Sequence, residues 1–341
     1  MRRTLGRAAV LVAASVSVII ASPQTQPPTF VAGNRTVAVY ATVTNARGRL
    51  EPDLKQDVFA IDDNGKRQTL TLFANDIQPI TLIMLLDRSG SMKQNFDLEE
   101  RAAEAFVREM FPTDKARIGS FASRVQIDPE DFTSDRDTLL KILRNDLQDD
   151  GPTPLWNAVD RAIDKLLIEK GRRVVLVFTD GVDQPLNFQN HNKSLKDVMK
   201  RAEEEDVMVY AIGLAGQNGV PTVSGRVDDR GRGMNPGAFG GLGGRGLGGN
   251  TGRTPSLEQP DEGLPKIAAA TGGGYFELTS PRDLANTFAK VADELHHQYA
   301  LGFAPEKLDG KMHDITLHLS RPDLVARARK RYLASKALGG A

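Results

Sequence analysis

The sequence contains no cysteine among its 341 residues. Disulfide frameworks, thiolate zinc sites, cysteine nucleophiles and lipid attachment through cysteine are therefore all excluded. Histidine is also scarce, with five in the chain, which leaves few ways to build a histidine-rich metal centre. These absences narrow the metal chemistry that is open to this protein.

Neither sign of charge is in excess. Lysine plus arginine and aspartate plus glutamate each number 44, so the formal net charge is zero. A general nucleic-acid-binding protein would carry a basic excess, and we therefore expect no nucleic-acid partner. The length of 341 residues suits one large domain or two small ones.

The longest apolar run lies at the N-terminus and is short. Residues 8–21 form an apolar stretch of about 14 residues behind three arginines, whereas a membrane-spanning helix needs ~20. Pro23 follows at once. We therefore expect residues 1–22 to be a secretory signal peptide, which makes the protein secreted, periplasmic or part of the cell envelope. An uncleaved membrane anchor stays open, because Ile19 or Ile20 falls where a small residue usually precedes cleavage.

One stretch organises the rest of the chain, TLIMLLDRSGSM at residues 81–92. Its apolar part, residues 82–86, is unbroken, which is typical of a strand buried on both faces. Residues 96–111 then place apolar side chains on one side of a helix. The polar residues between strand and helix should lie at the carboxyl end of a parallel strand, where open α/β sheets bind their ligands.

Those polar residues are rich in oxygen. Asp87, Ser89 and Ser91 follow one another within five positions, on a turn that Gly90 can bend. Short oxygen side chains without sulfur or imidazole suit a hard cation such as Mg²⁺.

The pattern Asp87-x-Ser89-x-Ser91 resembles the first motif of the metal-ion-dependent adhesion site in the von Willebrand factor A family. That family also needs a threonine in a Gly/Pro loop and an aspartate after a later core strand. Thr153 in DGPTPL and Asp180 after RVVLVFT stand in the matching order. The resemblance covers roughly residues 78–299. It implies a doubly wound, mostly parallel sheet, and the flanks also resemble bacterial secreted VWFA-related proteins.

The resemblance implies five metal-site residues, which are Asp87, Ser89, Ser91, Thr153 and Asp180. The three hydroxyls would bind Mg²⁺, with Mn²⁺ or Ca²⁺ as alternatives, and the two carboxylates would hold waters on the metal. A metal with few carboxylate ligands stays electron-poor, and it would accept an acidic side chain of a partner protein. In the other interpretation, the carboxylates cap their turns and the hydroxyls cap a helix N-terminus. Arg88 would either help recognise an acidic partner or face solvent.

The function implied is therefore metal-dependent protein binding or cell adhesion, without catalysis. Two alternatives stay open: a structural metal in an assembly or sensing component of an envelope complex, or a hydrolase. Against an enzyme, the sequence has no GxSxG elbow, no GxxxxGK[ST] loop, and no histidine in the three metal segments. Residues 241–246 match GxGxxG, but they lie inside a glycine run, and we expect no nucleotide.

Strands alternate with helices across residues 78–298, as βαβ units do. Residues 216–263 interrupt this pattern and are too rich in glycine to bury a core, so we expect a flexible insertion. Residues 23–35 are expected to be a linker. Residues 36–77 and 299–334 contain strands without helices, and each is too short to fold alone. We expect these two segments to form one small β-sandwich.

Three local patterns in the flanks have two interpretations each. Residues 62–65, DDNG, favour a hairpin turn between strands at 58–61 and 69–73 over a calcium loop. His296 and His297 are adjacent at a helix end, which favours a structural role over a metal site. The alternating arginines of residues 325–332 favour the solvated face and edge of a sheet over a nucleic-acid patch.

Overall fold

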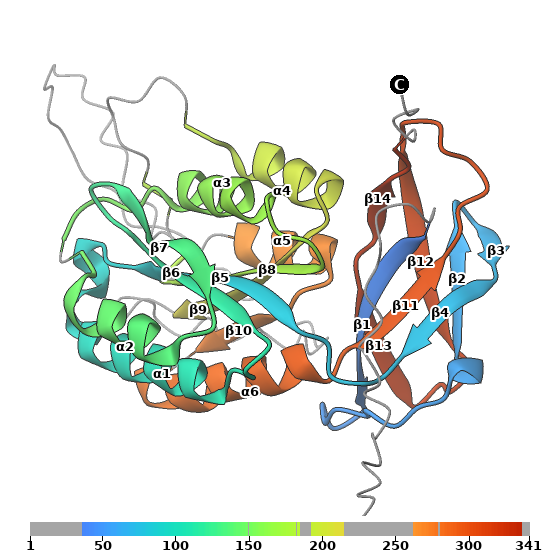
Figure 1. Ribbon diagram of the computed structural model, residues 1–341, viewed down its shortest axis with the longest axis horizontal. Coiled ribbons are helices and arrows are strands. Elements are labelled where there is room, and N and C mark those ends of the chain that lie inside the picture. The colour runs from blue at the N-terminus through green and yellow to red at the C-terminus, as the bar shows by residue number, and fades with distance from the viewer. Residues whose placement is uncertain are drawn as a thin grey trace, which may run out of the picture.

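The computed structural model describes residues 36–148, 150–181, 183–184, 192–214, 262–278 and 280–335. The expected signal peptide, the linker and nearly all of the glycine-rich segment lie outside these residues. Figure 1 shows two units side by side, a sheet covered by helices on both faces and a β-sandwich. None of the helices in the described ranges is long and apolar enough to cross a membrane.

The sheet of the α/β unit has six strands in the order β10-β9-β8-β5-β6-β7. Their bounds are β5 (Ile80–Asp87), β6 (Lys115–Phe121), β7 (Val125–Thr133), β8 (Arg172–Thr179), β9 (Val207–Leu214) and β10 (Tyr275–Leu278). Every neighbouring pair is parallel except β6 and β7, which form an antiparallel hairpin at one edge. The expectation of a doubly wound, mostly parallel sheet is confirmed.

Helices cover both faces of this sheet (Figure 1). One face is packed by α1 (Phe96–Glu109), α2 (Arg136–Asn145) and α6 (Leu284–His296), and the other by α3 (Leu155–Leu166), α4 (Leu195–Glu204) and α5 (Gly263–Thr271). The central strand β5 serves both cores. Its residues Leu82, Met84 and Leu86 enter the first core, and Ile83 and Leu85 enter the second. This double burial explains the unbroken apolar run in the sequence.

The second unit is a sandwich of two four-stranded antiparallel sheets, with orders β13-β1-β11-β4 and β14-β12-β2-β3. The N-terminal strands are β1 (Val37–Asn45), β2 (Phe59–Asp63), β3 (Lys66–Gln68) and β4 (Leu70–Ala74). The C-terminal strands are β11 (Tyr299–Phe303), β12 (Met312–Leu319), β13 (Leu324–Ala328) and β14 (Arg331–Leu333). Both sheets mix the two ends of the chain around one core, which confirms the expected shared sandwich. The described residues also contain three short 3-10 helices: η1 (Gln56–Val58), η2 (Gly90–Asn95) and η3 (Pro281–Asp283).

Two strand expectations were wrong in their pairing. The turn at Asn64 and Gly65 has positive φ at both residues, 49° and 78°, as a two-residue hairpin requires. Its second strand is the short β3, however, and the chain then crosses to the other sheet as β4. The basic segment divides in the same way, into β13 and β14 in different sheets. A sandwich closes partly through strands that change sheet, and strand propensity does not show where the change occurs.

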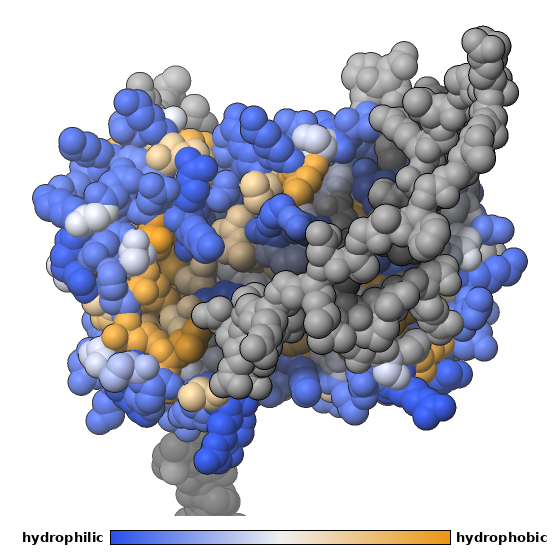
Figure 2. Space-filling model, turned by 180° about the vertical axis from the view of Figure 1, so that it is seen from behind, coloured by the Kyte–Doolittle hydropathy of each residue, from blue (hydrophilic) through white to orange (hydrophobic). Residues whose placement is uncertain are grey.

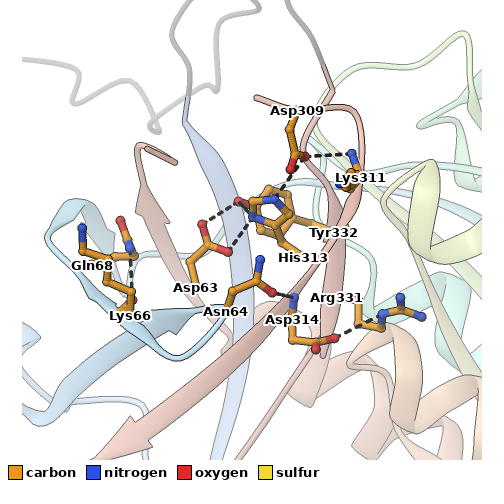
Figure 3. A network of polar contacts seen from close by, with 10 residues as sticks. All are labelled: Asp63, Asn64, Lys66, Gln68, Asp309, Lys311, His313, Asp314, Arg331 and Tyr332. Atoms are coloured by element: carbon orange, nitrogen blue, oxygen red, sulfur yellow. Dashed lines mark hydrogen bonds and ion pairs between the residues drawn. The ribbon is translucent and has the colours of Figure 1, made fainter. Parts of the chain in front are cut away.

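A polar cluster joins the two ends of the chain inside the sandwich (Figure 3). Asp63 on β2 accepts a hydrogen bond of 3.0 Å from the Tyr332 hydroxyl on β14. Its other oxygen lies 2.8 Å from Nδ1 of His313 on β12, and His313 Nε2 lies 3.3 Å from Asp309. Burial, with Asp63 beside it, raises the pKa of Tyr332, so its hydroxyl stays protonated and donates. The cluster fixes β2 against β12 and β14.

The alternating arginines do not form a uniformly solvated face, which corrects our expectation in part: Arg331 is exposed, whereas Arg327 and Arg329 are partly buried. β13 is an edge strand as expected, but Arg327 forms an ion pair with Glu294 on α6. Arg329 contacts Asp206, at 2.7 Å, and Arg331 on β14 lies 3.8 Å from Glu203. These residues attach the sandwich to the α/β unit. Alternation on a strand shows that one face is polar, and it does not show whether another unit covers that face.

A buried hydrogen-bond network completes the junction between the two units. Glu294 accepts hydrogen bonds from the Tyr210 hydroxyl at 2.6 Å and the Thr42 hydroxyl at 3.2 Å. The amide of Gln298 donates to the same two hydroxyls, at 2.9 and 2.7 Å. Arg172, the first residue of β8, donates to Gln298 and to the Leu295 carbonyl. The sandwich therefore sits at the amino ends of the parallel strands.

Figure 2 shows the molecule from the opposite side. Polar residues cover most of the described surface in this view, and hydrophobic residues gather in a hollow on the sandwich side. Among the described residues, the large hydrophobic side chains that are exposed are Ile77, Ile168 and Val325. Most other large hydrophobic side chains lie in or against the three cores.

Candidate metal site

The candidate site lies where the strand order of the sheet reverses. The chain leaves β5 toward β6 on one side, and β8 pairs with β5 on the other. Loops diverge at such a point and leave a crevice at the carboxyl ends of the strands. Asp87 is the last residue of β5, and Asp180 directly follows β8. The end of the sheet that carries these residues is opposite to the end that contacts the sandwich.

Asp87 is the buried base of the site, with no exposed surface. One carboxylate oxygen accepts the Ser89 N–H at 2.9 Å, and the other accepts the Thr179 hydroxyl at 2.5 Å. Burial raises the pKa of Asp87 to about 6, and the charge of Asp180 adds to this rise, while the hydrogen bonds from Ser89 and Thr179 oppose it. A nearby cation would favour the ionised form.

The two serines lead from this buried carboxylate to the surface. Ser89 is buried and Ser91 is exposed, and their hydroxyl oxygens are 3.1 Å apart. Ser89 precedes η2, but its side chain makes no capping hydrogen bond. The interpretation in which the hydroxyls cap a helix is therefore wrong for Ser89. The interpretation in which the carboxylates cap their turns holds in part for Asp87, because Asp87 accepts a hydrogen bond from its own turn.

The loop that carries Thr153 packs against the serine loop. The Gly90 N–H donates to the Gly151 carbonyl at 3.2 Å. Gly151 has φ of +152°, and a Cβ there would lie 2.4 Å from the Ser123 nitrogen, so only glycine fits. Thr153 is buried, and its carbonyl accepts the N–H groups of Leu155 and Gln184, both at 2.8 Å. These backbone bonds fix Thr153 in the loop cluster around Asp87.

Sequence reasoning missed two contributors to the site. Thr179 donates to Asp87, and the available signal was a hydroxyl at the carboxyl end of a core strand, directly before Asp180. The second is Arg88, which is 6% exposed. The expectation that Arg88 faces solvent is therefore wrong, and its help in recognising an acidic partner stays a prediction. No sequence pattern indicated that its guanidinium turns inward.

The residues fit a hard divalent cation. The donors are hydroxyl and carboxylate oxygens, which Mg²⁺ and Ca²⁺ prefer. Asp87 is ionisable and buried, and a cation would offset the cost of its negative charge. The described part of the chain holds no group of three carboxylate or imidazole side chains placed to bind a metal. A metal here would consequently depend on the hydroxyls of Ser89, Ser91 and Thr153.

Comparison with known proteins gives one family. Residues 81–228 match the family model of the von Willebrand factor type A domain. A search of curated proteins returned no match.

Solved structures with similar folds were also found. A von Willebrand factor type A protein from Catenulispora acidiphila is 10% identical, with a TM-score of 0.46, over 92% of this chain and 78% of the other. An aerotolerance-related membrane protein from Bacteroides fragilis NCTC 9343, with multiple mutations to serines, is 17% identical, with a TM-score of 0.43, over 63% and 98%. The vWF domain of the type V pili tip protein Mfa5 from Porphyromonas gingivalis is 11% identical, with a TM-score of 0.42, over 64% and 95%.

Proposed function

This chain carries a von Willebrand factor type A domain at residues 81–228, and from that premise we propose that it is a metal-dependent protein-binding module. The metal is Mg²⁺, with Mn²⁺ or Ca²⁺ as alternatives, and the partner is a protein that presents an acidic side chain. The place of action is the cell envelope or the exterior, reached through the signal peptide expected at residues 1–22.

One observation carries the proposal. A fully buried aspartate, Asp87, lies beneath two neighbouring hydroxyls, Ser89 and Ser91, of which the second is exposed. A ligand at this place would meet buried negative charge on one side and solvent on the other. That arrangement supports a cation that keeps one coordination position open toward a partner.

Each side chain has a distinct part in this proposal. Ser89, Ser91 and Thr153 would bind the ion, and Asp87 and Asp180 would hold waters on it. Thr179 fixes one oxygen of Asp87 through its hydrogen bond, so the carboxylate is oriented before any ligand arrives. The bound ion would supply a positive centre that attracts a carboxylate of the partner.

We propose no catalytic step. Four of the five histidines lie in the described residues, and none belongs to the metal loops: His296 and His297 end α6, and His313 and His318 lie in or beside β12. His191 lies outside the described residues. A structural metal in an assembly or sensing component, or a hydrolase, would give different results in the test below.

The test uses chemically blocked carboxylates. The protein is immobilised and exposed to envelope extract with Mg²⁺ or with a chelator, and to extract whose carboxylates have been converted to amides. We expect partner capture only with Mg²⁺ and only from untreated extract. Ser89→Ala should lose capture, whereas Ser320→Ala in the sandwich should retain it. Capture that persists in chelator and after amidation would contradict binding through a metal-bound carboxylate.

The pKa of Asp87 predicts how metal affinity depends on pH. Mg²⁺ binds the ionised form of Asp87. Below its pKa of about 6, Asp87 is mostly protonated and must lose its proton before the ion binds. Apparent affinity should therefore fall by up to about tenfold per pH unit below that pKa. Mg²⁺ titrations across this range measure the effect. An affinity that is unchanged between neutral pH and about pH 5 would contradict the assignment of Asp87.

In the metal-free protein, the free energy of unfolding should fall as pH rises, whereas Mg²⁺ affinity rises with pH. Burial raises the pKa of Asp87 from 3.8 to about 6, so the neutral acid is favoured in the folded state. Its contribution to the free energy of unfolding, about 3 kcal/mol for a shift of about two units, is fully present below about pH 4. That contribution is lost as pH rises through about 6. Urea unfolding in chelator measures it, and the isosteric Asp87→Asn should remove the dependence.

A further inference from the structure

Arg88 lies between two residues of the candidate site but points behind it. Its Nε donates to the Gln148 carbonyl at 2.7 Å. Its guanidinium carbon lies 3.6 Å from the ring centre of Phe96, and Nη1 lies 3.5 Å from a carboxylate oxygen of Glu99. Phe96 and Glu99 belong to the first turns of α1. One side chain therefore joins the serine loop, α1 and the loop that leads to Thr153.

Gln148, which accepts the hydrogen bond from Arg88, is itself held in place by further hydrogen bonds. The Gln148 amide donates to the carbonyls of Ser120 and Arg124, at 3.0 and 2.9 Å. Its side-chain oxygen, Oε1, accepts the Arg124 N–H at 3.3 Å. These bonds tie residue 148 to the β6–β7 turn. The position of the Thr153 loop is thus set by contacts on both of its sides, from Gly90 and from Arg88.

Burying the carboxylate of Glu99 in this arrangement costs free energy. It has no exposed surface, and its contact with Nη1 of Arg88, at 3.5 Å, is longer than a well-formed hydrogen bond. A buried ion pair of this kind is weak evidence for stability, since apolar residues of similar volume often serve as well or better. Stability therefore does not explain the pair. Its place beside Asp87 indicates a role in the candidate metal site.

Building on the function proposed above, we propose that Arg88 is a positioning residue that sets the spacing between the serine hydroxyls and Thr153, and thereby the preference for Mg²⁺ over Ca²⁺. Mg²⁺ demands near-ideal octahedral geometry at about 2.1 Å, whereas Ca²⁺ accepts variable geometry at about 2.3–2.6 Å. A loosened site should therefore lose Mg²⁺ more than Ca²⁺. The planar guanidinium reaches three neighbours at once, which the single ammonium of lysine cannot do.

The test compares both ions in the full chain by titration calorimetry. Arg88→Met combined with Glu99→Leu removes the pair without leaving either partner as an unpaired buried charge. We expect about 10- to 100-fold weaker Mg²⁺ binding, the usual cost of losing a residue that orients metal ligands. Ca²⁺ affinity should change by less than about threefold, and thermal stability should not fall. Arg88→Lys, which keeps the charge, should show the same selective loss if the double variant does not fold.

Arg321→Met is the matched control, because Arg321 pairs with exposed Asp323 in the sandwich, and it should bind both ions as the wild type does. Unchanged Mg²⁺ affinity in the variants, or equal loss of both ions, would overturn the positioning role. These outcomes are separate from failure of the proposed function. If the wild type binds Mg²⁺ and Asp87→Ala does not, the site stands, and the Arg88 variants test its spacing alone. A wild type that binds neither ion would overturn both proposals.

Discussion

Ending the chain at Gln298 should unfold the N-terminal strands and leave much of the α/β unit folded. The deletion removes β11 and β13, which are the two neighbours of β1, and β12, which pairs with β2. What remains of the sandwich is residues 36–77, close to the ~40 residues below which domains usually need disulfides or metals. The chain has no cysteine. The α/β unit keeps all six strands and α6.

Hydrogen exchange on the truncated protein measures this effect. In the intact chain β1 pairs with β11 along residues 37–41 and with β13 along residues 41–45, whereas in the truncated chain the amides of Val37–Val43 should exchange at nearly unfolded rates. The amides of β5 and β8 should stay protected. Ending the chain at Ser335 is the control, since it removes none of the strands. Protection of Val37–Val43 equal to that in the full chain would refute the shared sandwich as the source of their stability.

Glu294→Ala should cost about 2–4 kcal/mol of unfolding free energy, because it removes one half of a largely buried charge pair. Glu294 is 7% exposed, pairs with Arg327, and accepts hydrogen bonds from Tyr210 and Thr42. The substitution leaves a cation and two hydroxyls without their acceptor at the junction of the two units. Glu294→Gln keeps an acceptor and should cost less.

Urea unfolding of the two variants gives the comparison, with exposed Glu277→Ala as the control. The Mg²⁺ affinity of Glu294→Ala should match the wild type, because the junction lies at the amino ends of the strands and the metal site at the carboxyl ends. β5 alone separates these ends by about 23 Å. If Glu294→Ala lowered the free energy of unfolding by no more than about 0.5 kcal/mol, as surface substitutions typically do, the junction would contribute little to stability.

Local patterns predicted the parts of this protein that depend on local chemistry. The unbroken apolar run of β5 indicated a strand buried on both faces, and the structure places its side chains in two cores. Asp87 and Asp180 each close an apolar run, which indicated a position at the carboxyl end of a strand, and the structure has both at such ends. Hairpin chemistry located the turn at Asn64 and Gly65. Each of these signals is contained within a few neighbouring residues.

The failures share one physical cause, which is contact between residues distant in sequence. Arg329 pairs with Asp206, 123 residues away, so the strand pattern that carries it could not tell a solvated face from a covered one. Arg88 turns inward because Gln148, 60 residues later, offers its carbonyl. The change of sheet after β3 likewise depends on β11 and β12, at the other end of the chain.

Titration of Mg²⁺ into the wild type and Asp87→Ala, near neutral pH and after chelator treatment, tests the central claim most directly. Asp87→Ala should remain folded, since the hydrogen bonds that its side chain accepts come from the serine loop and from Thr179, and circular dichroism checks this. The wild type should bind one Mg²⁺ per chain and Asp87→Ala none. Equal binding of Mg²⁺ by the two folded proteins, or none by the wild type, would contradict a metal site at the carboxyl end of β5.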